Sequence, residues 1–267
     1  MGGKRSNTSP VCRSATLAAG RVGLLGVAGR TQPEQHAPPR QRLRIRYAKR
    51  GRARFTSSRD FGRAFERALR RADVPMAYSS GFSPHPRISY ANSVPTGAAS
   101  EAEYLEIGLI EPCDPEKVRA ALDAALPPGL DILEVVSASR TPLSDLLTGS
   151  LWRIDFVGVP DAVLEYAVDR FLAASSVPVQ RMTKNGLRDF DARNAVMSLS
   201  IDRTSLLLLA SHSAPLVRPD DVLAALGRLA PDFQPSEVPL CTRLRQGTLN
   251  SSTGEIDEPA STAPPER

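Results

Sequence analysis

The order of strand-like and helix-like segments between residues 42 and 246 is the feature that most limits the possible folds. Apolar residues alternate at Leu43, Ile45 and Tyr47, which is typical of a half-buried strand. Residues 60–74 carry apolar side chains at helical spacing, and Ser57 or Ser58 can cap that helix. The rest of this first set is predicted as strands at 87–91 and 102–110, a helix at 114–126 and a strand at 130–138.

A second set of segments follows in nearly the same order. It comprises a strand at 151–159, a helix at 161–175, strands at 177–183, 196–202 and 205–213, a helix at 219–230 and a strand at 238–246. The order predicts the α+β class, with two tandem ferredoxin-like (βαββαβ) units at 42–139 and 151–246. Residues 140–150 are predicted as a linker. The polar ends, 1–41 and 247–267, are predicted to be disordered tails.

Charge is distributed unevenly along the chain. Residues 41–71 carry twelve Lys and Arg against Asp60 and Glu66, while the whole chain has a formal net charge of only +5. Such an arrangement suits either a polyanion partner or a domain that neutralises itself. No apolar run approaches the ~20 residues of a membrane-spanning helix. We therefore expect a soluble, cytoplasmic protein without a membrane partner.

The first candidate binding surface is the basic helix. Arg59, Arg63, Arg67 and Arg70 lie within about 80° of each other on a helical wheel, opposite the phenylalanine face. Lys49, Arg50, Arg52 and Arg54 precede them. Arginine offers fixed, bidentate donors to phosphate oxygens, which favours binding of RNA or another anion. The alternative is a solvated helix face that is partly paired with the chain's own acids, and the few aromatic residues argue against sequence-specific RNA recognition.

The second candidate is the loop Gly81-Phe82-Ser83-Pro84-His85-Pro86. Each proline fixes its own backbone and extends the residue before it, so His85 is held on a stiff segment. Its imidazole can donate, accept or bind a metal, although a single histidine makes a poor metal site and none is predicted. The alternative is a turn whose histidine hydrogen-bonds a backbone group.

Two acids supply a possible catalytic set. Glu101 and Glu103 could perform acid–base chemistry if folded close to His85. The favoured alternative is that one of them pairs with an arginine of the basic helix. Asp191 is a plausible cap or arginine partner. The chain contains no phosphate-binding glycine motif, zinc-protease motif or serine-hydrolase motif, so the catalytic residues stay open.

The ordered run "RLRIRYAKRGRARFTS", "DFGRAFERALRRADVPMAYSSGFSPHPRISYA", "PTGAASEAEYLEIGL" and "TKNGLRDFDARN" resembles the radical SAM-linked protein family, a domain of unknown function. The resemblance covers residues 42–246, and the G-F-x-P-H-P segment is its clearest mark. Members occur fused to, or encoded beside, radical SAM proteins that bind B12. The resemblance therefore implies a radical SAM partner.

Two departures from the family limit what the resemblance implies. Ser58 stands where the family has a histidine, so a site that needed that histidine together with His85 would be impaired. The cluster motif is also absent, because Cys12, Cys113 and Cys241 lie far apart. An iron–sulfur cluster, SAM and cobalamin are thus expected only in a partner, and no cofactor is expected in this chain.

Taken together, we expect an accessory, substrate-handling protein that binds RNA or another anion and is not a self-sufficient enzyme. The alternative is a small RNA-modifying or hydrolytic enzyme that uses His85 with Glu101 or Glu103. The expected binding residues are Arg54, Ser57, Arg59, Asp60, Arg63, Arg67, Arg70, Gly81, Phe82, Pro84, His85 and Pro86.

Overall fold

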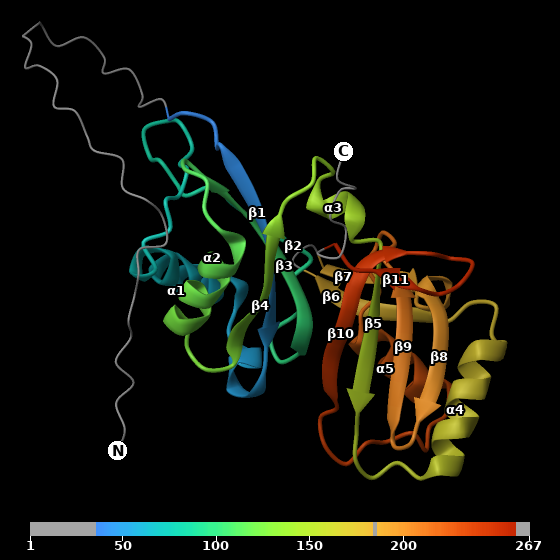
Figure 1. The fold of residues 1–267 in the computed structure, drawn as a ribbon. Helices are drawn as coiled ribbons and strands as arrows, with labels where there is room; N and C mark the ends of the chain where they lie inside the picture. The colour runs from blue at the N-terminus through green and yellow to red at the C-terminus, as the bar shows by residue number, and fades with distance from the viewer. Residues whose placement is uncertain (1–35, 184–185, 260–267) are drawn as a thin grey trace, which may run out of the picture.

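The computed structural model describes residues 36–183 and 186–259. In its first half, four paired strands carry two helices on one face (Figure 1). The elements are β1 (Gln41–Lys49), a 3-10 turn η1 (Gly51–Phe55), α1 (Ser58–Arg71), β2 (Ile88–Ala91), β3 (Ala99–Leu109), α2 (Pro115–Ala125) and β4 (Leu130–Ser137). Leu43, Ile45 and Tyr47 of β1 pack beneath α1 and α2, as the alternation predicts.

The second half contains seven further strands. Its elements are α3 (Leu143–Leu146), β5 (Gly149–Asp155), α4 (Asp161–Ala173), β6 (Pro178–Thr183), β7 (Gly186–Asp191), a 3-10 turn η2 (Arg193–Ala195), β8 (Val196–Asp202), β9 (Ser205–Ser211), α5 (Pro219–Leu229), β10 (Leu240–Leu249) and β11 (Ile256–Asp257). Side chains of α4 and α5 pack with β5 and β9 in a second core. The short α3 lies within the predicted linker, and β6 and β7 form a separate hairpin.

The two halves share one nine-stranded sheet. Its path runs β4-β1-β3-β10-β5-β9-β8, with β2 beside β3 and β11 beside β10. Within each half the neighbouring strands are antiparallel. The halves meet where β10 pairs in parallel with the start of β3, at Thr242↔Ala99 and Arg243↔Ser100. The α+β class is therefore confirmed, and the sequence analysis did not predict that one sheet joins the two sets.

The end of the chain differs from the predicted disordered tail. The last long strand ends at Leu249 instead of residue 246, and Ile256 then returns to pair with Leu249. Residues 247–259 are ordered because Ile256 is buried and the Glu258 carboxylate binds the guanidinium groups of Arg46 and Arg245, at 2.7 and 3.1 Å. Residues 1–35 and 260–267 of the two predicted tails lie outside the described residues. No helix in the described ranges is long and apolar enough to cross a bilayer.

Candidate functional site

The helix α1 begins at a side-chain cap that the sequence predicts. The Ser57 hydroxyl accepts a hydrogen bond from the backbone N–H of Asp60 at 3.1 Å and donates to the Asp60 carboxylate at 2.7 Å. The Asp60 carboxylate in the first turn also complements the positive end of the helix dipole. On the inner face, the ring of Phe61 stacks on that of Tyr47 with 4.4 Å between centroids. Ser57 and Asp60, predicted as binding residues, therefore start and orient the helix.

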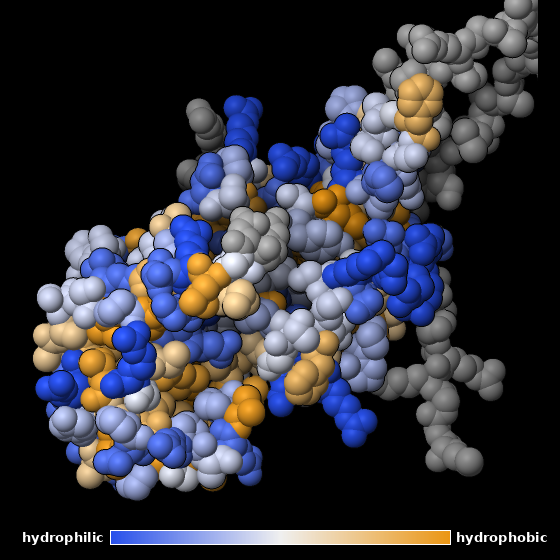
Figure 2. Space-filling view, turned by 180° about the vertical axis from the view of Figure 1, so that it is seen from behind, coloured by the Kyte–Doolittle hydropathy of each residue, from blue (hydrophilic) through white to orange (hydrophobic). Residues whose placement is uncertain are grey.

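The arginines on the outer face of α1 are exposed. Figure 2 shows strongly hydrophilic side chains gathered over this helix. The group comprises Arg59, Arg63, Arg67 and Arg70, which we call the arginine row. Only Arg63 has a carboxylate oxygen within 4.0 Å among the described residues, and that contact, with Asp60, is at the 4.0 Å limit. All four guanidinium groups face solvent, and among the described residues three of them, Arg59, Arg67 and Arg70, have no carboxylate oxygen within 4.0 Å.

The arginines of β1, in contrast, are paired with carboxylates. The guanidinium of Arg44, only 1% exposed, donates to the Glu106 carboxylate at 2.8 Å, and Arg42 binds the same carboxylate at 2.9 Å. Arg46 binds Glu258, as described above. The basic segment therefore contains strand arginines that carboxylates neutralise and, on α1, the arginine row, which faces solvent; Arg71 at the end of α1 donates to the carbonyl of Ala125.

Most of the cations from the end of β1 to the start of α1 also have partners within the fold. The Arg50 guanidinium binds the carboxylates of Glu101 and Asp131, at 2.7 and 2.8 Å. The Lys49 ammonium donates to the carbonyl of Thr56 at 2.9 Å, and burial lowers the pKa of Lys49. The Arg54 guanidinium lies over the ring of Phe55, 4.5 Å from its centroid, while Arg52 is exposed. Arg54, predicted as a binding residue, is thus only partly accessible.

The loop at 79–86 is closed by its own backbone. The Ser79 N–H donates to the carbonyl of His85 at 2.9 Å, and the His85 N–H donates to the Ser79 hydroxyl at 3.0 Å. Gly81 has a φ of +135°, which favours glycine, and Phe82 is 80% exposed. The backbone of His85 therefore holds the loop, while its side chain is exposed.

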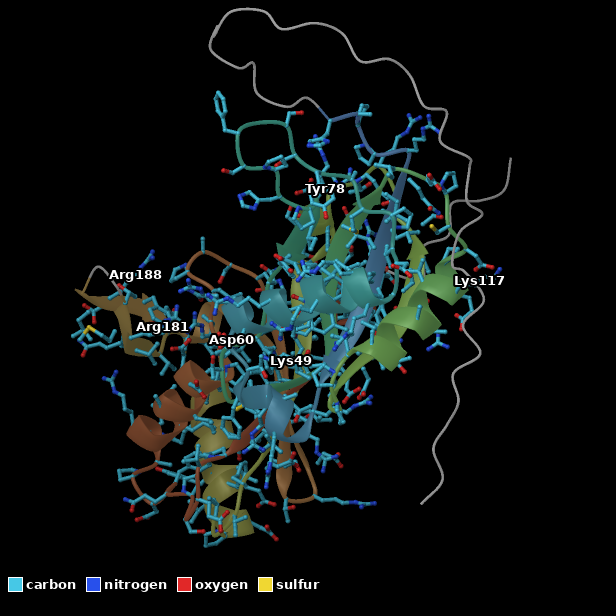
Figure 3. All side chains as sticks on the ribbon, turned by 90° about the vertical axis from the view of Figure 1, so that its left-hand side faces the viewer. Lys49, Asp60, Tyr78, Lys117, Arg181 and Arg188 are labelled. Carbon is cyan, nitrogen blue, oxygen red and sulfur yellow. The ribbon has the colours of Figure 1, made fainter. Side chains whose placement is uncertain are left out.

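A cavity of about 220 Å³ joins the loop to α1. Its lining residues are Glu66, Leu69 and Arg70 of α1, Val74, Pro75 and Met76 after the helix, and Tyr78, Pro86 and Ile110 around the loop. Figure 3 views this side of the molecule face on, with Asp60 near the start of α1 and Tyr78 above the helix. The structure thus brings together Arg70 and Pro86, which the sequence predicts as parts of two separate sites.

The candidate catalytic residues are not brought together. Ala91 of β2 lies opposite Tyr104 of β3, which is next to Glu103. His85 precedes Ala91 by six residues, or about 20 Å of extended chain, in the direction that leads away from Glu103. Glu101 is engaged by Arg50, and Glu103 is buried and bound by Arg243. Neither acid pairs with the basic helix, because their arginine partners come from the end of β1 and from β10. The geometry supplies no acid–base set at His85.

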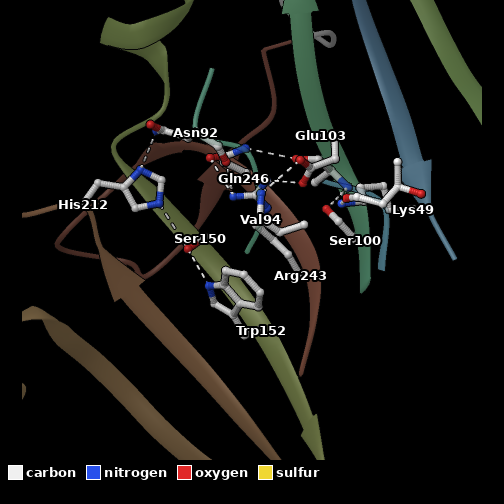
Figure 4. Close-up of polar contacts among 12 residues, drawn as sticks. Lys49, Asn92, Val94, Ser100, Glu103, Ser150, Trp152, His212, Arg243 and Gln246 are labelled. Carbon is white, nitrogen blue, oxygen red and sulfur yellow. Dashed lines mark hydrogen bonds and ion pairs between the residues drawn. The ribbon is translucent and has the colours of Figure 1, made fainter. Parts of the chain in front are cut away.

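The carboxylate of Glu103 belongs to a buried polar network at the junction of the two halves (Figure 4). It binds the guanidinium of Arg243 and accepts a hydrogen bond from the backbone N–H of Val94 at 3.1 Å. Arg243 also donates to the carbonyl of Asn92 at 2.8 Å and lies over the Trp152 ring. These contacts tie β10 to the first half, which is a structural role for Glu103.

His212 lies at the other end of this network. Its Nδ1 lies 2.6 Å from the carbonyl oxygen of Leu147, and its Nε2 lies 3.1 Å from the hydroxyl of Ser150. Burial lowers the pKa of His212, and the positive charge of Arg243 acts in the same direction. The imidazole is therefore held neutral and, within the described residues, belongs to no cluster of three His, Cys, Asp or Glu able to hold a metal.

Ser58 and Asp191 have ordinary structural positions. Ser58 is the exposed first residue of α1, two turns before Glu66, and it has no contact with His85 among the described residues. The Asp191 carboxylate accepts hydrogen bonds from the backbone N–H groups of Val177 and Arg193, at 2.8 and 2.9 Å. These bonds lower its pKa against the opposing effect of burial. Asp191 thus connects Val177 to the start of η2, whose N-cap residue is Ala192.

Sequence reasoning missed two residues beside the arginine row, Tyr90 and Tyr78. Tyr90 is 41% exposed on β2, and its hydroxyl lies beside Gly62 of α1. Burial, followed by the negative charge of Glu66, raises the pKa of Tyr90 to about 12. Tyr78 is 38% exposed at the cavity. The outward-facing position of Tyr90 in the strand was a usable signal, whereas the approach of Tyr78 to Glu66 depends on tertiary packing.

Comparison with known proteins places this fold in a family. A solved structure described as an unknown protein from Galdieria sulphuraria is similar over 78% of this chain and 99% of that chain, at 15% identity and a TM-score of 0.22, too low to support an argument. No curated protein matches. Residues 42–219 match the family described as an uncharacterized protein conserved in bacteria (DUF2344). Because that match spans more than half of the sequence, the chain belongs to this family of uncharacterized bacterial proteins.

Proposed function

We propose that the chain is an accessory, substrate-handling protein that binds RNA through the arginine row of α1. The observation that carries this proposal is the contrast between β1 and α1. The strand arginines meet internal carboxylates at 2.7–2.9 Å, whereas Arg59, Arg67 and Arg70 have none within 4.0 Å among the described residues.

Phosphate is the anion that best suits this surface. Each guanidinium presents a planar fork of donors that matches two phosphate oxygens, and the row extends from Arg59 to Arg70, eleven residue steps or about 16 Å of helix. A row of this length can contact several successive phosphates of one strand. The exposed rings of Tyr90 and Tyr78 beside the row also offer stacking surfaces for bases.

The accessory role rests on the resemblance to the radical SAM-linked family. Its members occur with radical SAM proteins, and the three cysteines of this chain lack the spacing of a cluster motif. In this proposal the chain holds an RNA for a separate radical SAM protein, which supplies the cluster and SAM. We also propose that each half is a ferredoxin-like unit, since the strand orders β4-β1-β3-β2 and β10-β5-β9-β8 correspond element by element.

The test is RNA binding by the purified chain as a function of salt. A variant with Arg59, Arg63, Arg67 and Arg70 changed to glutamine should bind single-stranded RNA far more weakly. The slope of log K against log salt should fall by up to about 3, because each lost phosphate contact removes ~0.7 from the slope. The matched control changes four exposed cations elsewhere to glutamine: Lys117, Arg140, Arg170 and Arg203.

The control variant has the same net charge as the test variant and should keep the wild-type slope. Equal losses in both variants would show that only net charge matters and would contradict a site on α1. Co-purification at low salt tests the partner: a cluster-bearing protein should be recovered with the wild-type chain. Its absence would remove the radical SAM part of the proposal.

A further inference from the structure

The cavity between α1 and the loop has an apolar interior. Leu69, Val74 and Met76 are buried side chains that form part of its lining, together with the exposed Ile110. None of these apolar side chains can donate a hydrogen bond to a phosphate group. An apolar cavity of about 220 Å³ fits one flat ring system instead, and the Tyr78 ring on its wall provides a stacking surface.

Polar groups are present on the helix side of the cavity. Glu66 and Arg70 are one helical turn apart and both line it, yet no ion pair forms between them within 4.0 Å. The carboxylate can accept hydrogen bonds from amino or imino groups of a base edge, and the guanidinium can donate to ring nitrogens or carbonyl oxygens. The pair therefore offers both kinds of partner that a nucleobase edge requires.

The cavity is continuous with the arginine row. Arg70 belongs to both, and on a helical wheel Glu66 lies within about 20° of Arg59 and about 40° of Arg70. A strand whose phosphates follow Arg59, Arg63 and Arg67 would thus reach the cavity at the end of the row. A duplex keeps its bases paired and stacked inside and cannot place one there.

We propose that this cavity takes one unpaired nucleobase of a single-stranded nucleic acid whose phosphates lie along the arginine row. The inference rests on the proposed function and specifies its ligand. The cavity selects single-stranded over double-stranded nucleic acid, and Tyr78 supplies the stacking surface for the inserted base.

The experiment measures fluorescence anisotropy with four labelled probes of equal length. They are a single-stranded RNA, the same strand with abasic sites, its duplex, and the single-stranded DNA of that sequence. The full chain should bind the intact strand about five-fold or more tighter than the abasic strand. Similar affinities for the RNA and the DNA would show that the chain recognises the bases. A marked preference for RNA would show that it also recognises the 2′-hydroxyl, and the comparison of intact with abasic RNA would then decide whether a base enters the cavity.

The variant Tyr78→Ala should remove most of the difference between the intact and abasic strands and leave the salt slope unchanged. Tyr166→Ala is its matched control, because Tyr166 is an exposed tyrosine on α4, far from the cavity in the sequence and on another helix. Glu66→Gln should change the preference among oligomers of different base composition.

The outcomes separate this inference from the proposed function. Steep, salt-dependent binding that is equal for intact and abasic strands would overturn the cavity proposal and leave the arginine row intact. Tighter binding of the duplex would also overturn it. Failure of every probe to bind, with the folded state verified by circular dichroism, would overturn the proposed function itself.

Discussion

At the scale of single residues, the same side-chain type takes opposite roles according to its partners. Arg44 and Arg70 lie in the same basic segment, but the first is buried against Glu106 and the second lines an open cavity. His212 and His85 differ in the same way. His212 is held between Leu147 and Ser150, whereas the side chain of His85 is exposed. The environment, and not the residue type, decides which of these side chains contributes contacts to the folded state.

The lowered pKa of His212 predicts a pH-dependent stability. Because the folded pKa lies below the ordinary value of about 6.5, the unfolded chain binds the proton more readily. The contribution of neutral His212 to the free energy of unfolding is complete above about pH 6.5. It is lost as the pH falls from there through the lowered pKa. In urea unfolding, the wild-type chain should lose more stability between pH 7 and pH 5 than the variant His212→Gln.

Replacing the exposed histidine gives the control for this comparison. The variant His85→Gln should keep the wild-type pH dependence over the same interval. A His212→Gln variant whose stability falls as steeply as that of the wild-type chain would show that another group is responsible.

At the scale of elements, local signals were sufficient for α1 and insufficient for its surroundings. The spacing of Phe61 and Phe65 and the cap at Ser57 lie within one segment, so the predicted helix at 60–74 corresponds to the observed Ser58–Arg71. The partners of the strand arginines come from β3, β4 and the chain end, far away in sequence. The cavity combines a helix, a loop and a strand end. Neither could be predicted from periodicity, because each depends on tertiary packing.

The junction of β3 and β10 predicts a strong effect of one buried pair. Changing Glu103 to glutamine leaves the Arg243 guanidinium buried without its acid, which should lower the free energy of unfolding by about 3–5 kcal/mol. The double variant Glu103→Leu/Arg243→Met should lose less than the sum of the two single changes, since it removes both charges. Equilibrium urea unfolding measures Glu103→Gln, the double variant and its two single changes, Glu103→Leu and Arg243→Met.

An exposed ion pair on α2 provides the comparison. The Glu116 and Arg119 side chains meet at 2.6 Å near the surface, where water screens the pair, so Glu116→Gln should cost far less stability than Glu103→Gln. If Glu103→Gln cost as little as this, the buried pair would not be what holds the two halves together.

At the scale of the whole molecule, the fold separates its charge into a satisfied and an unsatisfied face. One side of the first half carries the arginine row on α1. On the other face of the sheet, Arg44 and Arg46 of β1 meet Glu106 and the returning chain end. The predicted disordered tail was wrong for residues 247–259 because its acids and Ile256 find partners more than two hundred residues earlier or on the neighbouring β10.

The chain end should therefore control how many anion-binding surfaces the molecule has. Residues 250–267 carry four acids and one arginine, so ending the chain after Leu249 raises the formal net charge from +5 to +8. The truncation removes the Glu258 carboxylate that binds Arg46 and Arg245, and it exposes the part of β10 with which Ile256 pairs. We expect lower stability in urea and additional, salt-sensitive RNA binding that persists when the four arginines of α1 are changed to glutamine. Binding that still depends wholly on the arginine row would show that the Arg46 guanidinium stays paired with Glu134, that Arg245 contacts no RNA, and that the chain end only stabilises the sheet.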